Sequence, residues 1–369
     1  MNDLRYWIGF NRVTGIGPAK LRALLDHFGD LEAAWRADAA QLREAGLDRR
    51  ALEYLLAARA RMDLDAEVSK VERLGAAALT WNDPRYPPRL NSIDAPPPLL
   101  YVKGAFAPAD QWAVAVVGTR RATTYGREVT RSLVTDLARN GVTIVSGLAR
   151  GIDGAAHQAA LDAGGRTIAV LGHGIDHIYP PEHRKLAGQI VERGALVTDY
   201  PVGTLPEGRN FPPRNRIISG LSLGVLVVEG GLGSGAGITV DFAAEQGRDV
   251  FAVPGNILQR TSDLPNKLVQ EGATPVLSAE DILERLNLTM VAQHVEARAV
   301  IPQDATESRL LELLSADPVH IDDIQRTTGL PIDKVSSTLA LMELKGMVRQ
   351  VGGMNYIVAR EARVPYRVD

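Results

Sequence analysis

Three glycine-containing turns carry side chains suited to binding an anion, and each directly follows a strand-sized run of β-branched residues. They span 118–126, 146–154 and 230–237, and the first of them follows Ala113 to Val117. Glycine lets backbone amides approach a ligand closely, and Thr, Ser and Arg donate hydrogen bonds to phosphate oxygens. Any one of these turns alone is an ordinary connection between a strand and a helix. Together they predict an anion-binding surface.

A second group of candidate residues lies between the last two turns. Arg214-Asn215-Arg216 follows closely after Phe211. Guanidinium groups that hold phosphates beside an aromatic ring that stacks on a base are typical of proteins that bind single-stranded nucleic acid. A phenylalanine at a helix start is also an ordinary core residue, so the stacking role of Phe211 stays open at this point.

The elements that must position these residues alternate regularly between strands and helices. Further strand-sized runs lie at 142–145, 167–171, 224–229 and 249–253, and helix-sized segments lie between most of them, at 125–139, 155–163 and 240–246. Continuous apolar strands that alternate with helices predict a parallel sheet covered on both faces. In such a sheet ligands bind at the carboxyl ends of the strands, which is where the glycine turns lie.

The regions on either side of this α/β segment differ from it in composition and in the spacing of their apolar residues. Residues 1 to about 75 show helical spacing of apolar residues, the proline-rich stretch from Pro84 to Pro98 marks a boundary, and 287–305 has the composition of a linker. From Glu307 onwards the sequence predicts three short helices, followed by a hairpin over 346–358. Together these elements form a winged-helix pattern. The expected domains are therefore a helical domain over 1–75, an α/β domain over 76–290 and a winged-helix domain over 305–369.

Composition narrows the class of protein. The 369 residues include no cysteine, which excludes disulfide scaffolds, thiolate metal sites and cysteine nucleophiles. No apolar run reaches membrane-spanning length and no signal pattern opens the chain, so we expect a soluble cytoplasmic protein. The formal charge is −3, but residues 118–220 hold 13 basic and 9 acidic residues and the remainder holds 28 and 35. The local charge of +4 therefore lies around the glycine turns.

The sequence lacks two common enzyme motifs and the dinucleotide-binding motif. No Gly-Lys pair occurs, so a Walker A phosphate loop is absent. The glycines at alternate positions from Gly231 to Gly237 have the wrong spacing for a dinucleotide fold, and no acid ends the next strand. Ser222, in a Gly-x-Ser-x-Gly string, leads into a strand, whereas a nucleophile elbow follows one.

Histidines and acids in the same region suggest structural roles. His173, His177 and His183 lie with Asp176 around glycines in a loop, which disfavours a metal site because no helix face presents them together. Asp153 and His157 lie four residues apart at a helix start, where an acid is stabilised by the helix dipole, so a structural cap is favoured over a catalytic pair. No metal or cofactor is expected.

Several motifs in fixed order resemble the DprA/Smf family, DNA-processing protein A. They are Tyr86-Pro87-Pro88-Arg89-Leu90, Val117-Gly118-Thr119-Arg120, the segment from Ser146 to Asp153, the segment from Ala169 to Asp176 with Tyr179-Pro180, the segment from Phe211 to Leu221, and the segment from Gly247 to Gly255. The resemblance implies an extended Rossmann-like domain that binds single-stranded DNA and forms a homodimer. It also implies loading of a RecA-type recombinase during natural transformation, and a binding protein rather than an enzyme.

The resemblance also implies which residues form the DNA-phosphate pocket. Carried over position by position, they are Gly118, Thr119, Arg120, Ser146, Gly147, Gly151, Gly172, Gly174, Arg214, Arg216, Ser234 and Gly235. Phe211 is a further candidate DNA-binding residue from the pattern described above, not from the resemblance.

The two flanking domains have less certain partners. Residues Val13 to Leu21 look like a helix-hairpin-helix turn within a SAM-like domain, which serves either as a phosphate clamp or as a retained fold without DNA contact. The segment 303–369 has 8 basic and 10 acidic residues, and its third helix offers only Lys334 and Lys345. Because duplex binding needs a strong basic face, we expect a protein-interaction or weak DNA role there.

Two rival functions remain. One is a nucleotide N-glycosidase resembling the phosphoribohydrolases, in which Ser234 replaces their threonine and no glutamate follows until Glu245. The other is a duplex-binding transcription regulator, which rests on the winged helix alone.

Overall fold

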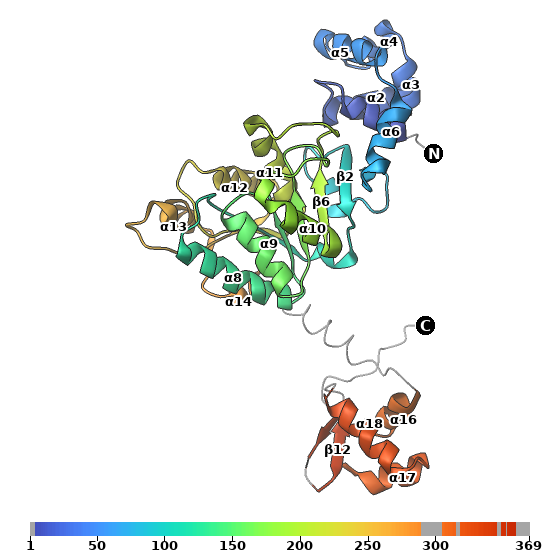
Figure 1. Ribbon diagram of the computed structural model, residues 1–369, viewed down its shortest axis with the longest axis vertical. Coiled ribbons are helices and arrows are strands. Elements are labelled where there is room, and N and C mark those ends of the chain that lie inside the picture. Colours follow the sequence, from blue (N-terminus) through green and yellow to red (C-terminus); the bar gives the residue numbers. More distant parts are fainter. Residues whose placement is uncertain (1–3, 289–304, 315–317, 345–347, 352, 359–369) are drawn as a thin grey trace. The chain divides into compact units, whose positions relative to one another are not determined.

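The computed structural model describes residues 4–288, 305–314, 318–344, 348–351 and 353–358. The chain forms two compact units, Met1–Leu288 and Thr289–Asp369 (Figure 1). The predicted linker at 287–305 lies mostly outside the described residues.

A nine-stranded sheet forms the centre of the first unit, within residues 4–288. Its strands are β1 (Ala77–Thr80), β2 (Leu99–Gly104), β3 (Ala113–Val117), β4 (Thr143–Ser146), β5 (Thr167–Val170), β6 (Ala195–Thr198), β7 (Gly224–Val227), β8 (Asp249–Ala252) and β9 (Thr274–Pro275). Their order across the sheet is β1-β2-β6-β5-β4-β3-β7-β8-β9. The strands from β3 to β9 pair in parallel, which confirms the predicted parallel sheet.

The edge formed by β1 and β2 differs from the prediction. β2 pairs antiparallel both with β1 and with β6. This edge was not predicted because β2 pairs with a strand about ninety residues further along the chain, and local periodicity carries no information on such pairing.

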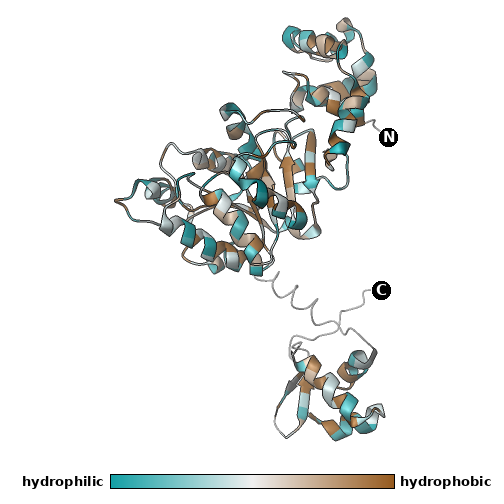
Figure 2. Cartoon of the chain, viewed as in Figure 1, coloured by the Kyte–Doolittle hydropathy of each residue, from teal (hydrophilic) through white to brown (hydrophobic). Residues whose placement is uncertain are grey.

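Helices cover both faces of the sheet. One face carries α8 (Thr124–Arg139), α9 (Ile152–Asp162), α10 (Arg184–Arg193) and α14 (Ala279–Arg285), and the other carries α7 (Pro88–Asn91), α11 (Phe211–Gly220), α12 (Gly235–Glu245) and α13 (Asp263–Gln270). Figure 1 shows α8, α9 and α10 side by side. Figure 2 shows the strands as mainly hydrophobic, with polar residues on the outer sides of the helices.

A crevice forms where two neighbouring strands are followed by helices on opposite faces of the sheet. The connection after β3 uses α8 on one face, whereas the connection after the neighbouring strand β7 uses α12 on the other. At such a switch point the loops diverge and leave room for a ligand at the carboxyl ends of the strands.

Two helices begin earlier than the sequence predicts. α9 begins at Ile152 rather than 155, and α12 begins at Gly235 rather than 240. Their first turns contain Gly154 and Gly237, which suggested loop, although the first turn of a helix tolerates glycine well. As a result both helix N-termini lie directly beside the strand ends.

Six helices precede the sheet within residues 4–76, and two of them, the first and the last, pack against its edge strands β1 and β2. The six are α1 (Leu4–Asn11), α2 (Pro18–Phe28), α3 (Leu31–Arg36), α4 (Ala39–Glu44), α5 (Arg49–Arg59) and α6 (Leu64–Arg73). The four helices α3 to α6 each begin after an aspartate whose side chain accepts a backbone N–H of the first turn, the standard N-cap. The turn before α2 contains Gly15 at φ +87°, a backbone angle that favours glycine.

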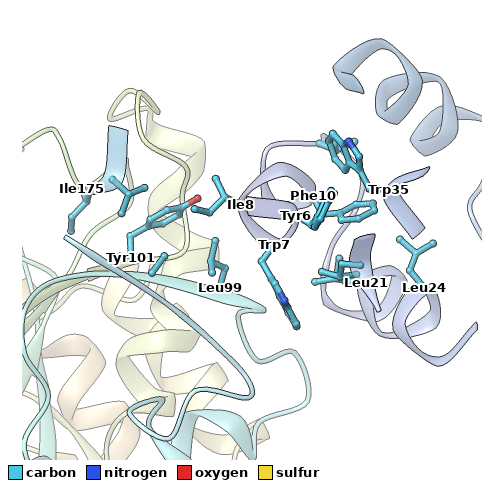
Figure 3. Close-up of a cluster of buried hydrophobic side chains, with 14 of the residues drawn as sticks. Tyr6, Trp7, Ile8, Phe10, Leu21, Leu24, Trp35, Leu99, Tyr101 and Ile175 are labelled. Carbon is cyan, nitrogen blue, oxygen red and sulfur yellow. The ribbon is translucent and has the colours of Figure 1, made fainter. Parts of the chain in front are cut away.

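Helix α1 contacts both the other N-terminal helices and the strand β2 of the sheet (Figure 3). Its Phe10 ring meets the Trp35 ring edge-on at 5.1 Å between centroids, and Ile8 lies beside Tyr101 of β2. The Tyr101 hydroxyl donates to the Asn11 side chain at 3.0 Å. The helices thus share one hydrophobic cluster with β2 and β6, and the expected domain boundary at residue 75 stays a prediction.

The second unit is a winged helix, as predicted. Its elements are α16 (Ala305–Leu313), β10 (Val319–His320), α17 (Ile321–Thr328), α18 (Ile332–Leu344), β11 (Val348–Gln350) and β12 (Asn355–Val358). The hairpin β11–β12 has the expected antiparallel pairing, and β10 adds a third strand beside β12. Among the residues that the structure describes in either unit, no helix is long and apolar enough to span a membrane.

The junction of α10 and β6 provides a test of this fold. A Cβ added at Gly194 would lie 1.9 Å from the backbone oxygen of Thr167, so Gly194→Ala must separate β5 from β6. We expect it to lower the free energy of unfolding by about 2 kcal/mol or more in urea denaturation. The matched control is Gly188→Ala in the middle of α10, where a Cβ meets nothing within 4 Å and should stabilise by about 0.5–1 kcal/mol. Equal stabilities of the two variants would contradict this packing.

Candidate functional site

A cavity of about 350 Å³ opens at the crevice between β3 and β7. We call it the first cavity. The turn after β3, the start of α9, helix α11 and the first turns of α12 line it. Seven predicted residues are among its lining: Gly118, Thr119, Arg120, Phe211, Arg214, Ser234 and Gly235. These seven residues come from two of the three glycine turns and from α11, and the turn at 146–154 contributes Ala149 and Asp153 to the lining.

The other six predicted residues support the first cavity without lining it: Ser146, Gly147, Gly151, Gly172, Gly174 and Arg216. Ser146 is buried and donates its hydroxyl to the Val116 carbonyl at 2.7 Å. Gly172 lies so close to Phe211 that an added Cβ would be 2.7 Å from the ring. Gly174 donates its N–H to the Thr204 carbonyl at 2.9 Å. Their polar groups are thus used within the protein or covered by it.

Arg214 joins two strand ends from inside the protein. Its side chain is only 4% exposed, and the guanidinium donates to the carbonyl oxygens of Gly147, at 2.9 Å, and Val170. A Cβ on Gly147 would lie 2.5 Å from the Arg214 Nη1 atom, so only glycine leaves room for this guanidinium. Arg214 therefore fixes the ends of β4 and β5 relative to α11, with one part of its side chain on the cavity wall.

Asp153 provides the opposite charge next to Arg214. Its Oδ2 accepts the N–H groups of Gly147, at 3.1 Å, and Ala149, at 3.3 Å. Burial raises the pKa of Asp153 and lowers the pKa of Arg214 to about 10, and the attraction between the two charges opposes both shifts. At neutral pH Arg214 keeps its charge. The sequence suggested a helix cap for Asp153, whereas the structure has it closing the turn that precedes α9.

The neighbours of Arg214 point in different directions. Asn215 donates its side-chain amide to the Gly235 carbonyl at 3.2 Å and so ties α11 to α12. Arg216 forms an ion pair with Asp199 at 2.7 Å, and both side chains are about five-sixths buried. Successive residues of a helix are about 100° apart around its axis, so the three residues do not present two guanidinium groups to one ligand.

Arg120 is the exposed cation of the first cavity. Its guanidinium makes no hydrogen bond or ion pair with the rest of residues 4–288, and its Cζ lies 5.4 Å from the centroid of the Phe211 ring. That distance is within the range of a cation–π contact. The turn beneath it is held by the Thr119 N–H, which donates to the Glu229 carbonyl at 2.7 Å, and by the Ile152 N–H, which donates to the Thr119 carbonyl.

Gly151 permits this close approach of two turns. Its φ is +78°, and an added Cβ would lie 2.2 Å from the Thr119 carbonyl oxygen. Both the backbone angle and the space require glycine here.

Sequence reasoning missed Glu229, which positions the turn that carries Arg120. Its carboxylate is 3% exposed and accepts both the N–H of Thr123, at 2.9 Å, and the Thr123 hydroxyl. The same hydroxyl accepts the Gly126 N–H and caps α8. The signal in the sequence was an acid at the end of an otherwise apolar strand.

The N-terminus of α12 faces the first cavity. Gly235 and Ala236 line it, and the first N–H groups of a helix have no partner within the helix and carry a partial positive charge. The buried Ser234 Oγ atom has no hydrogen-bond partner in the described part of the chain. Arg120, the α12 amides and the Phe211 ring thus surround one recess, which suits an anionic group attached to a flat ring.

Groups that could catalyse a reaction are poorly placed. Glu245 lies at the opposite end of α12 from Ser234, about 15 Å away at the rise of a helix. His173 is buried, with its Nδ1 atom 3.0 Å from the Gly174 carbonyl. Within the described residues no three metal-ligating side chains come together. The acid on the cavity wall, Asp153, already accepts two backbone N–H groups.

Comparisons with known proteins agree on one family. The family model described as DNA recombination-mediator protein A matches residues 77–287, and that of the DprA winged helix domain matches 294–354. Protein Smf of Synechocystis is 35% identical over 96% of this chain and 98% of its own length.

Two solved structures are similar to this one. DNA processing protein A from Streptococcus pneumoniae has a TM-score of 0.67 at 35% identity, covering 77% of this chain and 98% of that one. A structure on the single-stranded DNA binding mode of DNA processing protein A from Helicobacter pylori has a TM-score of 0.52 at 30% identity, covering 57% and 95%.

The buried His157 beneath the site predicts a pH dependence of stability. Its Nδ1 lies 2.6 Å from the Thr167 hydroxyl, and burial lowers its pKa to about 3, against 6.5 normally. Above pH 6.5 neither the folded nor the unfolded chain binds this proton. As the pH falls further, only the unfolded chain takes it up, so the free energy of unfolding should fall by up to about 1.4 kcal/mol per pH unit.

His157→Asn, which keeps a hydrogen-bonding group for Thr167 but does not titrate, should have a smaller slope in urea denaturation between pH 6.5 and 4. Equal slopes for wild type and variant would contradict a buried neutral His157.

Proposed function

This chain belongs to the DprA/Smf family of DNA processing proteins, and on that basis we propose that it binds single-stranded DNA in the first cavity. The observation that carries the proposal is the Arg120 guanidinium, which has no acidic partner among residues 4–288 and lies over the Phe211 ring beside the N-terminus of α12.

The groups around the first cavity divide between phosphate and base. Arg120 and the first amides of α12 are donors that suit phosphate oxygens. The Phe211 ring offers a flat apolar surface on which any base can stack. Phosphate contacts and stacking carry little sequence information, so binding should tolerate any sequence.

A recess that combines these groups favours a single strand over a duplex. In a duplex the faces of the bases are covered by their neighbours, whereas a single strand can turn a base out to meet an aromatic ring. The H. pylori relative, whose solved structure concerns single-stranded DNA binding, supports the same choice.

Delivery of the strand to a RecA-type recombinase during natural transformation is the second part of the proposal. Its support is the family description as a recombination mediator. A protein that holds the strand mainly by its phosphates leaves most bases free to pair in the next step.

Assembly as a homodimer through the Rossmann-like domain is the third part. Its support is the exposed apolar side chains Ile257, Leu258 and Leu277, which are 84–85% exposed on loops after β8 and β9. A contact with a second copy would remove this surface from water.

Arg120→Ala tests the DNA site. We expect it to weaken binding of a fluorescent single-stranded oligonucleotide about tenfold, because a charge-assisted phosphate contact is lost. The slope of log affinity against log salt should become shallower by about 1. The matched control is Arg139→Ala at the far end of α8, which should bind as wild type does.

The proposed function would be overturned if Arg120→Ala bound the oligonucleotide with wild-type affinity. It would also be overturned if the full-length protein bound duplex more tightly than single strand. Release of free base from nucleoside monophosphates would instead favour the N-glycosidase.

Arg214→Ala should behave differently from Arg120→Ala. It removes the donor from two buried carbonyl groups and takes away the strongest positive charge beside the buried Asp153 carboxylate. We expect a loss of about 3 kcal/mol or more in the free energy of unfolding, measured by urea denaturation. Arg120→Ala should leave that free energy unchanged because its side chain is exposed. A stable Arg214→Ala protein that merely binds DNA more weakly would contradict the internal role of Arg214.

A further inference from the structure

A second cavity of about 350 Å³ lies beside the first, between α9 and α10. Its lining consists of Gly154, Gln158, Glu182, His183, Lys185, Leu186 and Gln189. The two cavities are neighbours along the chain, because Asp153 lines the first and the next residue, Gly154, lines the second.

Aromatic and cationic side chains connect the two cavities. The Tyr179 ring lies 5.8 Å from the Phe211 ring, at 37° to it, and the tyrosine is 37% exposed. Arg150 forms an ion pair with Glu182 on the wall of the second cavity. Glu182 and, more weakly, Tyr179 raise the pKa of Arg150, so its guanidinium lies close to both. A surface suited to stacking thus continues from Phe211 over Tyr179 to the second cavity.

The second cavity differs from the first in its chemistry. Its two charged residues, Glu182 and Lys185, have opposite signs, so the lining itself has no net charge. Gln189 offers an amide group, which both donates and accepts hydrogen bonds as the edge of a base does. Gln158 donates one amide hydrogen to Asp162 at 2.8 Å and keeps its Oε1 atom as an acceptor.

His183 adds one more group of the same kind. Its Nδ1 atom lies 2.9 Å from the Leu148 carbonyl, so in the neutral ring Nδ1 carries the proton and Nε2 is an acceptor. The ring lies directly over Gly154, where an added Cβ would be 2.8 Å from the His183 Cε1 atom. The lining therefore suits an uncharged group rich in hydrogen-bond donors and acceptors.

We propose that the second cavity binds a base of the same DNA strand whose phosphate occupies the first cavity, with Tyr179 as the stacking surface between them. This inference rests on the proposed function and extends its site by one base-binding position. It makes the affinity depend on a base at a fixed distance from the phosphate held by Arg120, and not on the length of the phosphate chain alone.

The experiment compares oligonucleotides that have the same phosphates but different bases. A single strand of about 12 nucleotides, within the range of known single-strand sites, is made intact and with abasic sites at every position, so that no shift of the strand can place a base in the second cavity. Wild-type protein should bind the abasic strand at least about fivefold more weakly than the intact strand, the loss expected for one or more stacked or hydrogen-bonded bases.

Variants of the second cavity should reduce this difference. The double variant Gln158→Ala with Gln189→Ala should bind the intact strand about fivefold more weakly than wild type and should bind the abasic strand as wild type does. Tyr179→Leu, which keeps an apolar side chain but removes the ring, should do the same. The control is Gln111→Ala in the short helix Pro108–Gln111, whose exposed glutamine lies near the opposite, amino-terminal ends of the strands.

Each other outcome overturns the inference in a recognisable way. If wild type binds the intact and the abasic strand equally, no base is bound in the second cavity. If the double variant binds both strands more weakly by the same factor, or binds both as wild type does, the second cavity holds no base. In these cases a loss of affinity in Arg120→Ala would still support the proposed function, whereas the absence of that loss would refute the proposed function itself.

Discussion

A buried guanidinium organises the first cavity. Arg214 lies inside the protein. Its buried charge is stabilised because two backbone carbonyl groups accept hydrogen bonds from the guanidinium and the Asp153 carboxylate lies nearby. Those carbonyls belong to the ends of β4 and β5, and Asp153 holds the backbone amides of Gly147 and Ala149. Satisfying one buried charge therefore fixes two strand ends, the turn before α9 and the start of α11. The exposed groups that meet a ligand are placed by this internal arrangement.

The glycines of the turns serve packing more than ligand contact. Gly147 leaves space for the Arg214 guanidinium, Gly151 for the Thr119 carbonyl, and Gly172 for the Phe211 ring. Backbone segments that pack this closely become rigid, and rigidity keeps Arg120 and the α12 amides in position before a ligand arrives. The resulting site has few ligand-facing groups, held firmly.

The positive charge of the first cavity depends on where a few cationic groups lie, not on how many basic residues the region contains. The sequence has a local excess of +4 around the turns, but many of its arginines are paired with nearby acids, such as Arg131 with Glu128 and Arg209 with Glu207. Arg216 is paired too, and Arg214 is buried. What makes the first cavity cationic is the unpaired Arg120 with the partial charge of a helix end, a few groups in one recess rather than a net total.

The sequence by itself determined the order of strand, turn and helix, the parallel sheet, the edge at which the turns gather and the winged helix, because these follow from periodicity and turn residues within short windows. Only the tertiary structure decided that Arg120 faces outward while Arg214 faces inward, and that Glu229 positions Thr123 from 106 residues away. It also decided that β2 pairs antiparallel with β6, and that a second polar cavity adjoins the first. These features depend on which side chains lose contact with water and which distant backbone groups become their partners, and such information exists only once the chain has packed.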